Sequence, residues 1–180
     1  MSELLLGCGN HRDKLLYRPG EEAWTDLTTL DNDPNCGADV EWDLERMPLP
    51  FKDEQFDEIH AYHVLEHTGR MGDWRFFFAQ WSEFWRILKP GGLFCGSVPA
   101  MSSPWIFADP GHTRVILPES LTFLDQAEYT NQVGVTALAD YRRVYREDFE
   151  PLFREIRSGD DGSEQFYFIV QAMKPSRISV

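Results

Sequence analysis

Two glycines near the start of the chain could form the backbone loop of a ligand site. The apolar residues Leu4 to Leu6 run into Gly7-Cys8-Gly9, a pattern typical of a strand that ends in a tight turn. Glycine has no Cβ, so the backbone can bend sharply there and approach a ligand closely. A second apolar segment ends at Asp31, whose carboxylate could accept hydrogen bonds from ribose hydroxyl groups. The spacing predicts a nucleotide-type ligand at the ends of two parallel strands.

The same spacing also fits enzymes that bind NAD, but one residue argues against a dinucleotide. The G-x-G-x-x-G sequence of dinucleotide sites needs a third glycine at position 12, where this chain has Arg12. A side chain there opposes the close helix approach that a pyrophosphate requires. We therefore favour a ligand without a pyrophosphate and keep an NAD-dependent oxidoreductase as a weaker alternative.

A series of later motifs makes the interpretation specific. After the glycine loop come, in order, Asp43-Leu44, Met47-Pro48-Leu49-Pro50-Phe51, Gln55-Phe56-Asp57-Glu58-Ile59, His63-Val64-Leu65-Glu66-His67 and Ile87-Leu88-Lys89-Pro90-Gly91-Gly92. In this order and spacing the chain resembles the class I S-adenosylmethionine-dependent methyltransferases of the small methyltransferase-domain type. The resemblance runs from Leu4 to about Val98 and continues more weakly to Lys174.

The resemblance implies S-adenosyl-L-methionine as the methyl donor and S-adenosyl-L-homocysteine as the product. It assigns the ribose to Asp31, the adenine to Asp43 and Leu44, and further donor contacts to His63. The donor's methionine end is assigned to the loop Leu6, Gly7, Cys8, Gly9 and Asn10. Many family members have an acidic residue two positions before the first glycine, where this chain has Leu5. The carboxylate that anchors the loop and the donor's amino group is therefore missing at that position.

Histidines are the candidates for proton transfer. Methyl transfer from a sulfonium depends mainly on positioning, and a base is needed only for a weak nucleophile such as a hydroxyl. Imidazole titrates closest to neutral pH, so among His63, His67 and His112 we take His63 and His112 as the candidate catalytic residues. No metal site is expected, because His60 and His63 straddle the end of a predicted strand and the three cysteines have no C-x-x-C spacing.

Periodicity and turn residues predict the elements that must position these side chains. A short helix or turn is expected at 12–17, and a longer helix with an aromatic stripe should run from Asp73 to Lys89-Pro90-Gly91-Gly92. Strands are expected at 3–6, 26–30, 40–43, 56–61, 93–98, 153–157 and 166–173. This alternation predicts an α/β fold with a doubly wound, mostly parallel sheet. The resemblance implies the Rossmann-like methyltransferase fold, with about seven strands and an antiparallel last strand.

Residues 100–148 depart from this alternation. The stretch leaves the fifth strand at the ligand-binding edge, is longer than a crossover needs, and has a helix signal at Pro118-Glu119. We expect it to form the acceptor-side cover of a single methyltransferase-like domain spanning residues 1–180. Its most ligand-like side chains are Trp105, His112 and Tyr141.

Composition limits the partners and the location. The net charge of −13 opposes the phosphate neutralisation on which nucleic-acid affinity depends. No segment approaches the ~20 apolar residues that span a bilayer, and the first residues lack the basic region of a secretory signal. We expect a cytoplasmic methyltransferase for a small or medium-sized acceptor, with oxygen slightly favoured by family analogy and neither nucleic acid nor membrane as partner. The alternative is a non-catalytic module that binds S-adenosylmethionine or serves in assembly. The oligomeric state stays open.

Overall fold

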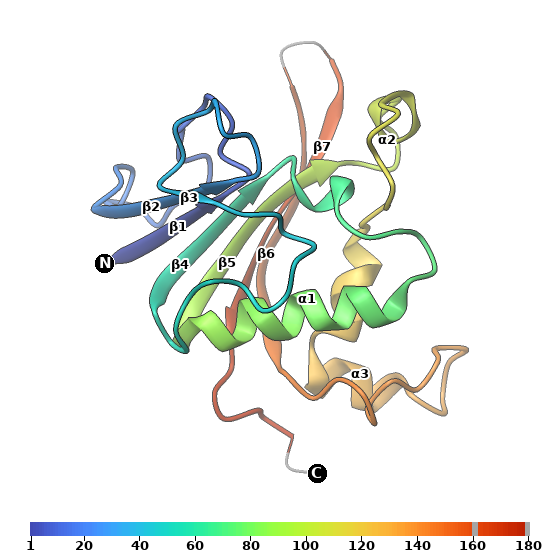
Figure 1. Ribbon diagram of the computed structural model, residues 1–180. Coiled ribbons are helices and arrows are strands. Elements are labelled where there is room, and N and C mark those ends of the chain that lie inside the picture. Colours follow the sequence, from blue (N-terminus) through green and yellow to red (C-terminus); the bar gives the residue numbers. More distant parts are fainter. Residues whose placement is uncertain (160–161, 179–180) are drawn as a thin grey trace.

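A seven-stranded mixed sheet forms the centre of the computed structural model, which describes residues 1–159 and 162–178 (Figure 1). The strands lie in the order β3-β2-β1-β4-β5-β7-β6. Neighbours from β3 to β5 are parallel, whereas β7 is antiparallel to both β5 and β6. The predicted α/β fold class, with its antiparallel last strand, is confirmed. The strands are β1 (Ser2–Leu6), β2 (Asp26–Asp31), β3 (Val40–Glu41), β4 (Phe56–Tyr62), β5 (Leu88–Pro99), β6 (Phe149–Ser158) and β7 (Glu164–Ala172).

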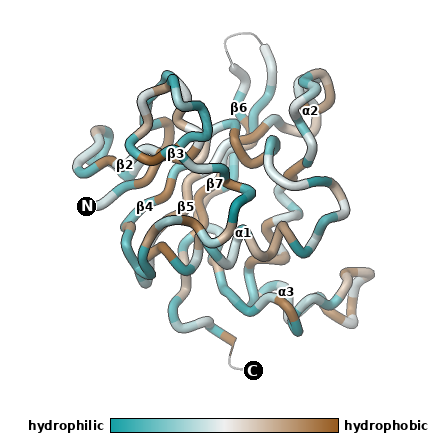
Figure 2. Tube along the Cα trace, viewed as in Figure 1, coloured by the Kyte–Doolittle hydropathy of each residue, from teal (hydrophilic) through white to brown (hydrophobic). Residues whose placement is uncertain are grey.

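The carboxyl ends of the parallel strands meet at one edge of the sheet. Leu6 of β1 is level with Leu30 of β2 and with Ala61 of β4. The residues that follow these three positions therefore leave the sheet side by side, as expected for a parallel α/β fold. Hydrophobic residues are concentrated in the central strands (Figure 2). Most residues of β1, β4 and β5 are buried.

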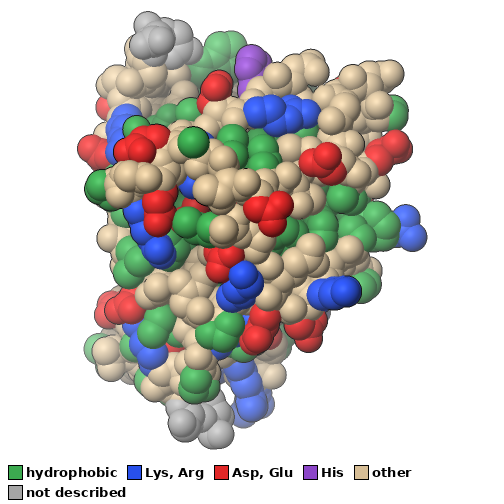
Figure 3. Space-filling view, turned by 90° about the vertical axis from the view of Figure 1, so that its left-hand side faces the viewer, with side chains coloured by type: hydrophobic (Ala, Val, Ile, Leu, Met, Phe, Trp, Pro, Cys, Tyr) green, Lys and Arg blue, Asp and Glu red, His purple; other side chains and the backbone are tan. Residues whose placement is uncertain are grey.

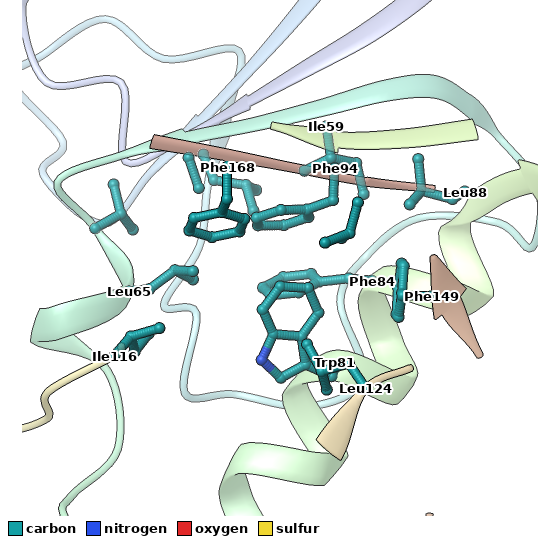
Figure 4. Close-up of a cluster of buried hydrophobic side chains, with 14 of the residues drawn as sticks. Ile59, Leu65, Trp81, Phe84, Leu88, Phe94, Ile116, Leu124, Phe149 and Phe168 are labelled. Atoms are coloured by element: carbon teal, nitrogen blue, oxygen red, sulfur yellow. The ribbon is translucent and has the colours of Figure 1, made fainter. Parts of the chain in front are cut away.

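Helix α1 (Trp74–Ile87) covers one face of the sheet. Its N-cap is Asp73, as predicted, whose side chain accepts a hydrogen bond from the backbone N–H of Phe76 at 3.1 Å. The aromatic stripe faces the sheet, where Trp81 packs on Phe94 with ring centroids 4.9 Å apart (Figure 4). The helix ends at Ile87, two residues before the expected stop, and the chain passes directly into β5.

Part of the opposite face, over β1, β4 and β5, is covered by residues 10–25, which form no helix; of the helix or turn expected at 12–17, the helical form is wrong. Leu16 is buried against this face of the sheet. Lys14 is drawn inward, with its Nζ 2.6 Å from Glu3 and 3.2 Å from Glu58. Because a segment this short before Pro19 gains little from helix formation, these tertiary contacts decide its conformation.

Residues 100–148 divide into an exposed part and a packed part. The segment contains α2 (Trp105–Ala108), the 3₁₀ helix η2 (Pro118–Phe123) and α3 (Gln126–Gln132), so the signal at Pro118 forms a 3₁₀ rather than an α-helix. Around α2, the side chains of Trp105 and Phe107 are 51% and 74% exposed. In the second part Tyr145 is buried and stacks on Phe78 of α1.

The surface carries charges of both signs. Figure 3 shows acidic and basic side chains interspersed on one face of the molecule. Two arginines of the C-terminal half have acidic partners, Arg142 with Asp140 at 2.8 Å and Arg157 with Glu155 at 2.6 Å. Among the described residues, no helix combines the length and apolar composition needed to cross a bilayer.

Candidate functional site

The loop after β1 depends on Gly7 for both conformation and space. Its φ is +58°, in the left-handed region that favours glycine. A Cβ at this position would lie 2.3 Å from Cγ2 of Val64, far inside contact distance. Gly9 also has a left-handed φ of +46°, but a Cβ there would meet no atom within 4 Å. The first glycine is therefore needed for packing, and the second for backbone conformation alone.

Asp31, at the end of β2, ties the glycine loop to the neighbouring strand. Its Oδ2 accepts a hydrogen bond from the N–H of Gly9 at 2.7 Å, and its Oδ1 accepts one from the N–H of Asp33 at 2.9 Å. An ionised carboxylate offers about four acceptor positions, so each oxygen keeps capacity for a further donor. Asp31 can thus hold the loop and still accept hydrogen bonds from a ligand.

A cavity of about 430 Å³ opens beside the loop at the strand ends, within the size range of small-molecule sites. The predicted donor-binding residues Gly7, Asp31, Asp43, Leu44 and His63 all line it. The other lining residues were not predicted as donor contacts: Leu30, Asn32, Trp42, Glu45, Val64, His67 and Thr68. Val64 and His67 belong to the motif that begins at His63. Asn32, Glu45 and Thr68 directly follow predicted residues or motifs, so these sequence neighbours could have been found from the motifs.

The remaining predicted loop residues do not line this cavity. Leu6 is fully buried in the core, and Cys8 packs with Cys36 on the other side of the loop. Asn10 is exposed, and Gly9 contributes its N–H to Asp31 rather than a wall of the cavity. Successive residues of a turn point in different directions, so of the five predicted loop residues Gly7 alone lines the cavity.

The site departs from the usual donor pocket at Leu5, and from a dinucleotide site at Arg12. Leu5 stands where many family members have an acidic residue, and its side chain is buried against Cys8 and Cys36. The Arg12 guanidinium donates to the backbone carbonyls of Gly9 at 2.6 Å and Cys36 at 3.0 Å. Since the described residues 10–25 form no helix, there is no helix N-terminus at the loop to bind a pyrophosphate.

A second cavity, of about 270 Å³, adjoins the first and shares His63 and His67 with it. It brings together both predicted catalytic residues, His63 and His112. Its other lining residues are Pro99, Ser103, Trp105, Asp109, Ser163 and Gln165. Tyr141 is elsewhere, in a separate cavity lined by Trp74 and Phe78 of α1.

His63 occupies a constrained position just after β4. Its φ of +55° is uncommon for a residue with a side chain, and its backbone N–H donates to the carbonyl of Ser97 at 2.9 Å. Its Nδ1 lies 3.2 Å from Oε1 of Glu66. Burial lowers the pKa of His63, but hydrogen bonds to Glu66 and Gln165 outweigh this effect and leave the pKa above its usual value.

His112 and His67 each have a ring nitrogen fixed by a backbone carbonyl. The Nδ1 of His112 lies 2.8 Å from the oxygen of Trp105, and the Nδ1 of His67 lies 3.2 Å from the oxygen of Gly111. A carbonyl only accepts, so Nδ1 carries the proton in both rings. In the neutral form, the lone pair of each imidazole is therefore on Nε2.

His60 belongs to a different cluster, on the face covered by residues 10–25. Its Nε2 lies 3.1 Å from Glu58, and its Nδ1 lies 2.7 Å from the hydroxyl of Tyr62. Burial dominates here and lowers the pKa of His60. This histidine is part of the core and does not reach either cavity.

Comparison with known proteins identifies the region that contains the glycine loop and the first cavity. The family model described as "Methyltransferase domain" matches residues 4–96, just over half of the chain. A sterol 24-C-methyltransferase from Pneumocystis carinii (strain B80) is 29% identical over 70 residues, which make up 39% of this chain and 17% of that enzyme. The chain thus matches less than one fifth of the length of this curated relative.

Solved structures share the fold over nearly the whole chain. A methyltransferase from Archaeoglobus fulgidus, described as S-adenosylmethionine-dependent, superposes with a TM-score of 0.56 at 15% identity, covering 94% of this chain and 85% of the other. A 1,6-didemethyltoxoflavin N1-methyltransferase from Burkholderia thailandensis, solved with S-adenosylhomocysteine bound, gives a TM-score of 0.58 at 16% identity, covering 96% and 71%. At these identities the likeness shows a common fold.

Proposed function

The chain belongs to the methyltransferase domain family, within the class I S-adenosylmethionine-dependent methyltransferases, and from this premise we propose that it methylates a small or medium-sized acceptor, preferentially at oxygen. One observation supports this most directly: the cavity beside the glycine loop adjoins a second cavity, and His63 and His67 line both. Two adjoining cavities suit a reaction that joins a donor and an acceptor.

The first cavity is suited to the donor in chemistry as well as in size. S-adenosylmethionine supplies a methyl group activated by a sulfonium. Asp31 and Asp43 offer carboxylate oxygens to hydroxyl and amino donors, and Trp42, Leu44 and Val64 supply apolar walls for a flat base. The carboxylates also favour a cationic ligand over an anionic one. Since Leu5 offers no carboxylate, the donor's amino group must find another acceptor.

The second cavity is the proposed acceptor side. His112 is our proposed general base, because Trp105 fixes its Nδ1 as the protonated nitrogen and leaves the Nε2 lone pair to take a proton. His63, oriented by Glu66, lies at the boundary of the two cavities and is the second candidate. We assign the cover of this site to residues 100–148, of which the part around Trp105 reaches the cavity. In this proposal residues 1–180 work as one domain in the cytoplasm.

Donor turnover tests the proposal. Purified protein is incubated with S-adenosylmethionine and a panel of small hydroxylated and amino acceptors, and S-adenosylhomocysteine is measured. We expect acceptor-dependent product, and His112→Ala should lower turnover while leaving donor affinity nearly unchanged. His11→Ala, at an exposed position outside both cavities, is the matched control. Donor binding without turnover on any acceptor would favour the non-catalytic binding module, and absence of donor binding would contradict the proposal altogether.

A further inference from the structure

Three metal-ligating side chains converge at the boundary of the two cavities. One ligand atom each from Glu66, His67 and His112 lies within 4.8 Å of the other two. Glu66 and His67 belong to the 3₁₀ helix η1 (Leu65–His67), whereas His112 comes from the segment after α2. No metal site was expected from the sequence, because His60 and His63 straddle the end of a strand. His112 is distant in sequence from Glu66 and His67 and comes close to them only in the folded chain.

Each of the two histidines has one ring nitrogen fixed by a backbone carbonyl, as metal-bound histidines usually have. A metal-bound histidine almost always donates its other ring N–H to a carbonyl, a carboxylate or water, which fixes the ring and its tautomer. His67 and His112 do this through Nδ1, to the carbonyls of Gly111 and Trp105. The Nε2 of each neutral ring is thereby left with a lone pair.

Glu66 supplies a buried anionic oxygen. The residue is 2% exposed, and its Oε1 lies 3.2 Å from Nδ1 of His63. Its Oε2 is buried and has no hydrogen-bond partner in the described part of the chain. Burying an unpaired carboxylate oxygen is costly, and buried charges are normally paired or bound to a metal.

The neighbouring cation Arg114 does not satisfy this oxygen. The Arg114 guanidinium makes its hydrogen bonds through Nη2, which donates to Leu65 at 3.2 Å, Thr68 at 2.9 Å and Gln80 at 2.5 Å. Its Nε and Nη1 are buried and make no hydrogen bond, to Glu66 or to any other group, in the described part of the chain. The charge of Arg114 acts on Glu66 without a hydrogen bond to it, so Oε2 of Glu66 keeps its capacity to bind a further positive partner.

We propose that Glu66, His67 and His112 bind a divalent transition-metal ion of the Zn²⁺ type. Two imidazoles with one carboxylate are typical of catalytic zinc sites, and they suit Zn²⁺ or Co²⁺ better than Mg²⁺, which prefers oxygen ligands alone. Three protein ligands leave at least one coordination position for water or for an oxygen of a bound molecule. Because His67 and His112 line the second cavity, that position is accessible to an acceptor.

Metal binding would change the role of His112. An Nε2 that binds a metal cannot accept a proton, so His112 would hold the ion instead of acting as the base. The ion would then lower the pKa of an acceptor hydroxyl bound to it. This catalytic consequence rests on the proposed methyl transfer, whereas metal binding itself does not.

Metal binding can be measured without turnover. Protein freed of metal by EDTA and dialysis is titrated with Zn²⁺ in competition with a chromophoric chelator, and with Co²⁺ while its visible absorption is recorded. We expect one equivalent per chain, a Co²⁺ spectrum of low coordination number, and no competition by Mg²⁺. Glu66→Gln and His112→Ala should each weaken Zn²⁺ binding by at least about tenfold, and His11→Ala should not.

Fold and donor binding are checked in the same preparations. Zn²⁺ should raise the melting temperature of the unmodified protein, and the gain should shrink in Glu66→Gln, a substitution that keeps the side-chain shape. Less than half an equivalent bound, or equal affinity in all four proteins, would overturn the proposal. If S-adenosylhomocysteine binds but Zn²⁺ does not, the metal site is wrong and methyl transfer stands. If neither binds, both proposals fail.

Discussion

The carboxylate of Asp31 accepts the backbone N–H of Gly9 at 2.7 Å, so the end of β2 holds the loop that follows β1. One side chain thereby fixes the backbone beside the donor cavity and also lines the cavity itself. Loss of this carboxylate should affect both the loop and any ligand that hydrogen-bonds to it.

Asp31→Ala should weaken S-adenosylhomocysteine binding by about 1–3 kcal/mol, the usual cost of leaving polar partners unmatched. Isothermal calorimetry measures this directly. The matched control is Asp33→Ala, because among the described residues the Asp33 side chain accepts hydrogen bonds only within its own turn, from Asn35. Equal affinity in Asp31→Ala and the control would remove Asp31 from the ribose site.

Gly7→Ala should abolish donor binding, whereas Gly9→Ala should weaken it only modestly. The new Cβ at Gly7 would lie 2.3 Å from Val64 Cγ2, and at Gly9 it would meet no atom within 4 Å. At Gly9 only the left-handed backbone conformation is strained, at a cost of about 1–2 kcal/mol. The double variant Gly7→Ala with Val64→Ala should recover part of the melting temperature lost in the single variant. If the melting temperature does not recover, the loss in Gly7→Ala comes from backbone strain and not from the contact with Val64.

Lys14→Met should destabilise the fold by about 3–5 kcal/mol, because it leaves the buried carboxylates of Glu3 and Glu58 without their ammonium partner. Urea unfolding gives the free energy. The control Arg157→Met removes a solvent-exposed pair with Glu155 and should cost less than about 1 kcal/mol. Similar losses in both variants would show that Lys14 is not the main partner of the buried carboxylates.

The same cluster sets a pH dependence of known sign. Burial raises the pKa of Glu58, but His60 and Lys14 outweigh it and hold the pKa below its usual value. Burial likewise raises the pKa of Glu3, and hydrogen bonds from Lys14 and Thr25 reverse that effect. A lowered folded pKa gives stability that is fully present above the unfolded value of about 4.3 and is lost as pH falls through the folded pKa.

Urea unfolding between pH 7 and pH 3 should therefore show a decline in stability to which Glu3 and Glu58 contribute below about pH 5. The Glu58→Gln variant, which has no carboxylate to titrate at that position, should show a shallower decline. Parallel curves for the two proteins would exclude Glu58 as a source of the acid sensitivity.

Donor binding should protect the exposed part of the proposed cover. Hydrogen exchange at residues 101–113 should slow on addition of S-adenosylhomocysteine, because the side chains of this stretch border the second cavity and are held by few buried contacts. Residues 121–145 serve as an internal reference, since Leu121 and Tyr145 are already buried against the core. Unchanged exchange at 101–113 would count against a cover that responds to the donor.

Local patterns in the sequence predicted most of the fold. Strands β1, β2 and β4 and the start of α1 are predicted within a residue, because apolar runs and the Asp73 cap are local signals. Of the helix or turn predicted at 12–17, the helix does not form because Lys14 and Leu16 are held by residues distant in sequence. Such contacts override propensity in a segment too short to form a stable helix.

The residues of the candidate site could be predicted where a single sequence motif contains both the loop and the residues that line the cavity. Gly7, Asp31, Asp43 and Leu44 follow from strand ends and family motifs, and all line the cavity that we propose for the donor. The approach of His112 to Glu66 and His67 could not be predicted, because it depends on the path of residues 100–113 across the sheet edge. The sequence pattern also does not predict where each loop side chain points, such as the packing of Cys8 against Cys36.

The position of β7 between β5 and β6 determines when the molecule can finish folding during synthesis. Residues 164–172 pair with both neighbours, so β5 keeps an unpaired edge until this last strand has left the ribosome. A chain that stops before residue 164 would expose backbone donors and acceptors along β5, next to the aromatic core around Trp81 and Phe94. Premature termination should therefore give a product that aggregates or is degraded, rather than a smaller protein with partial activity.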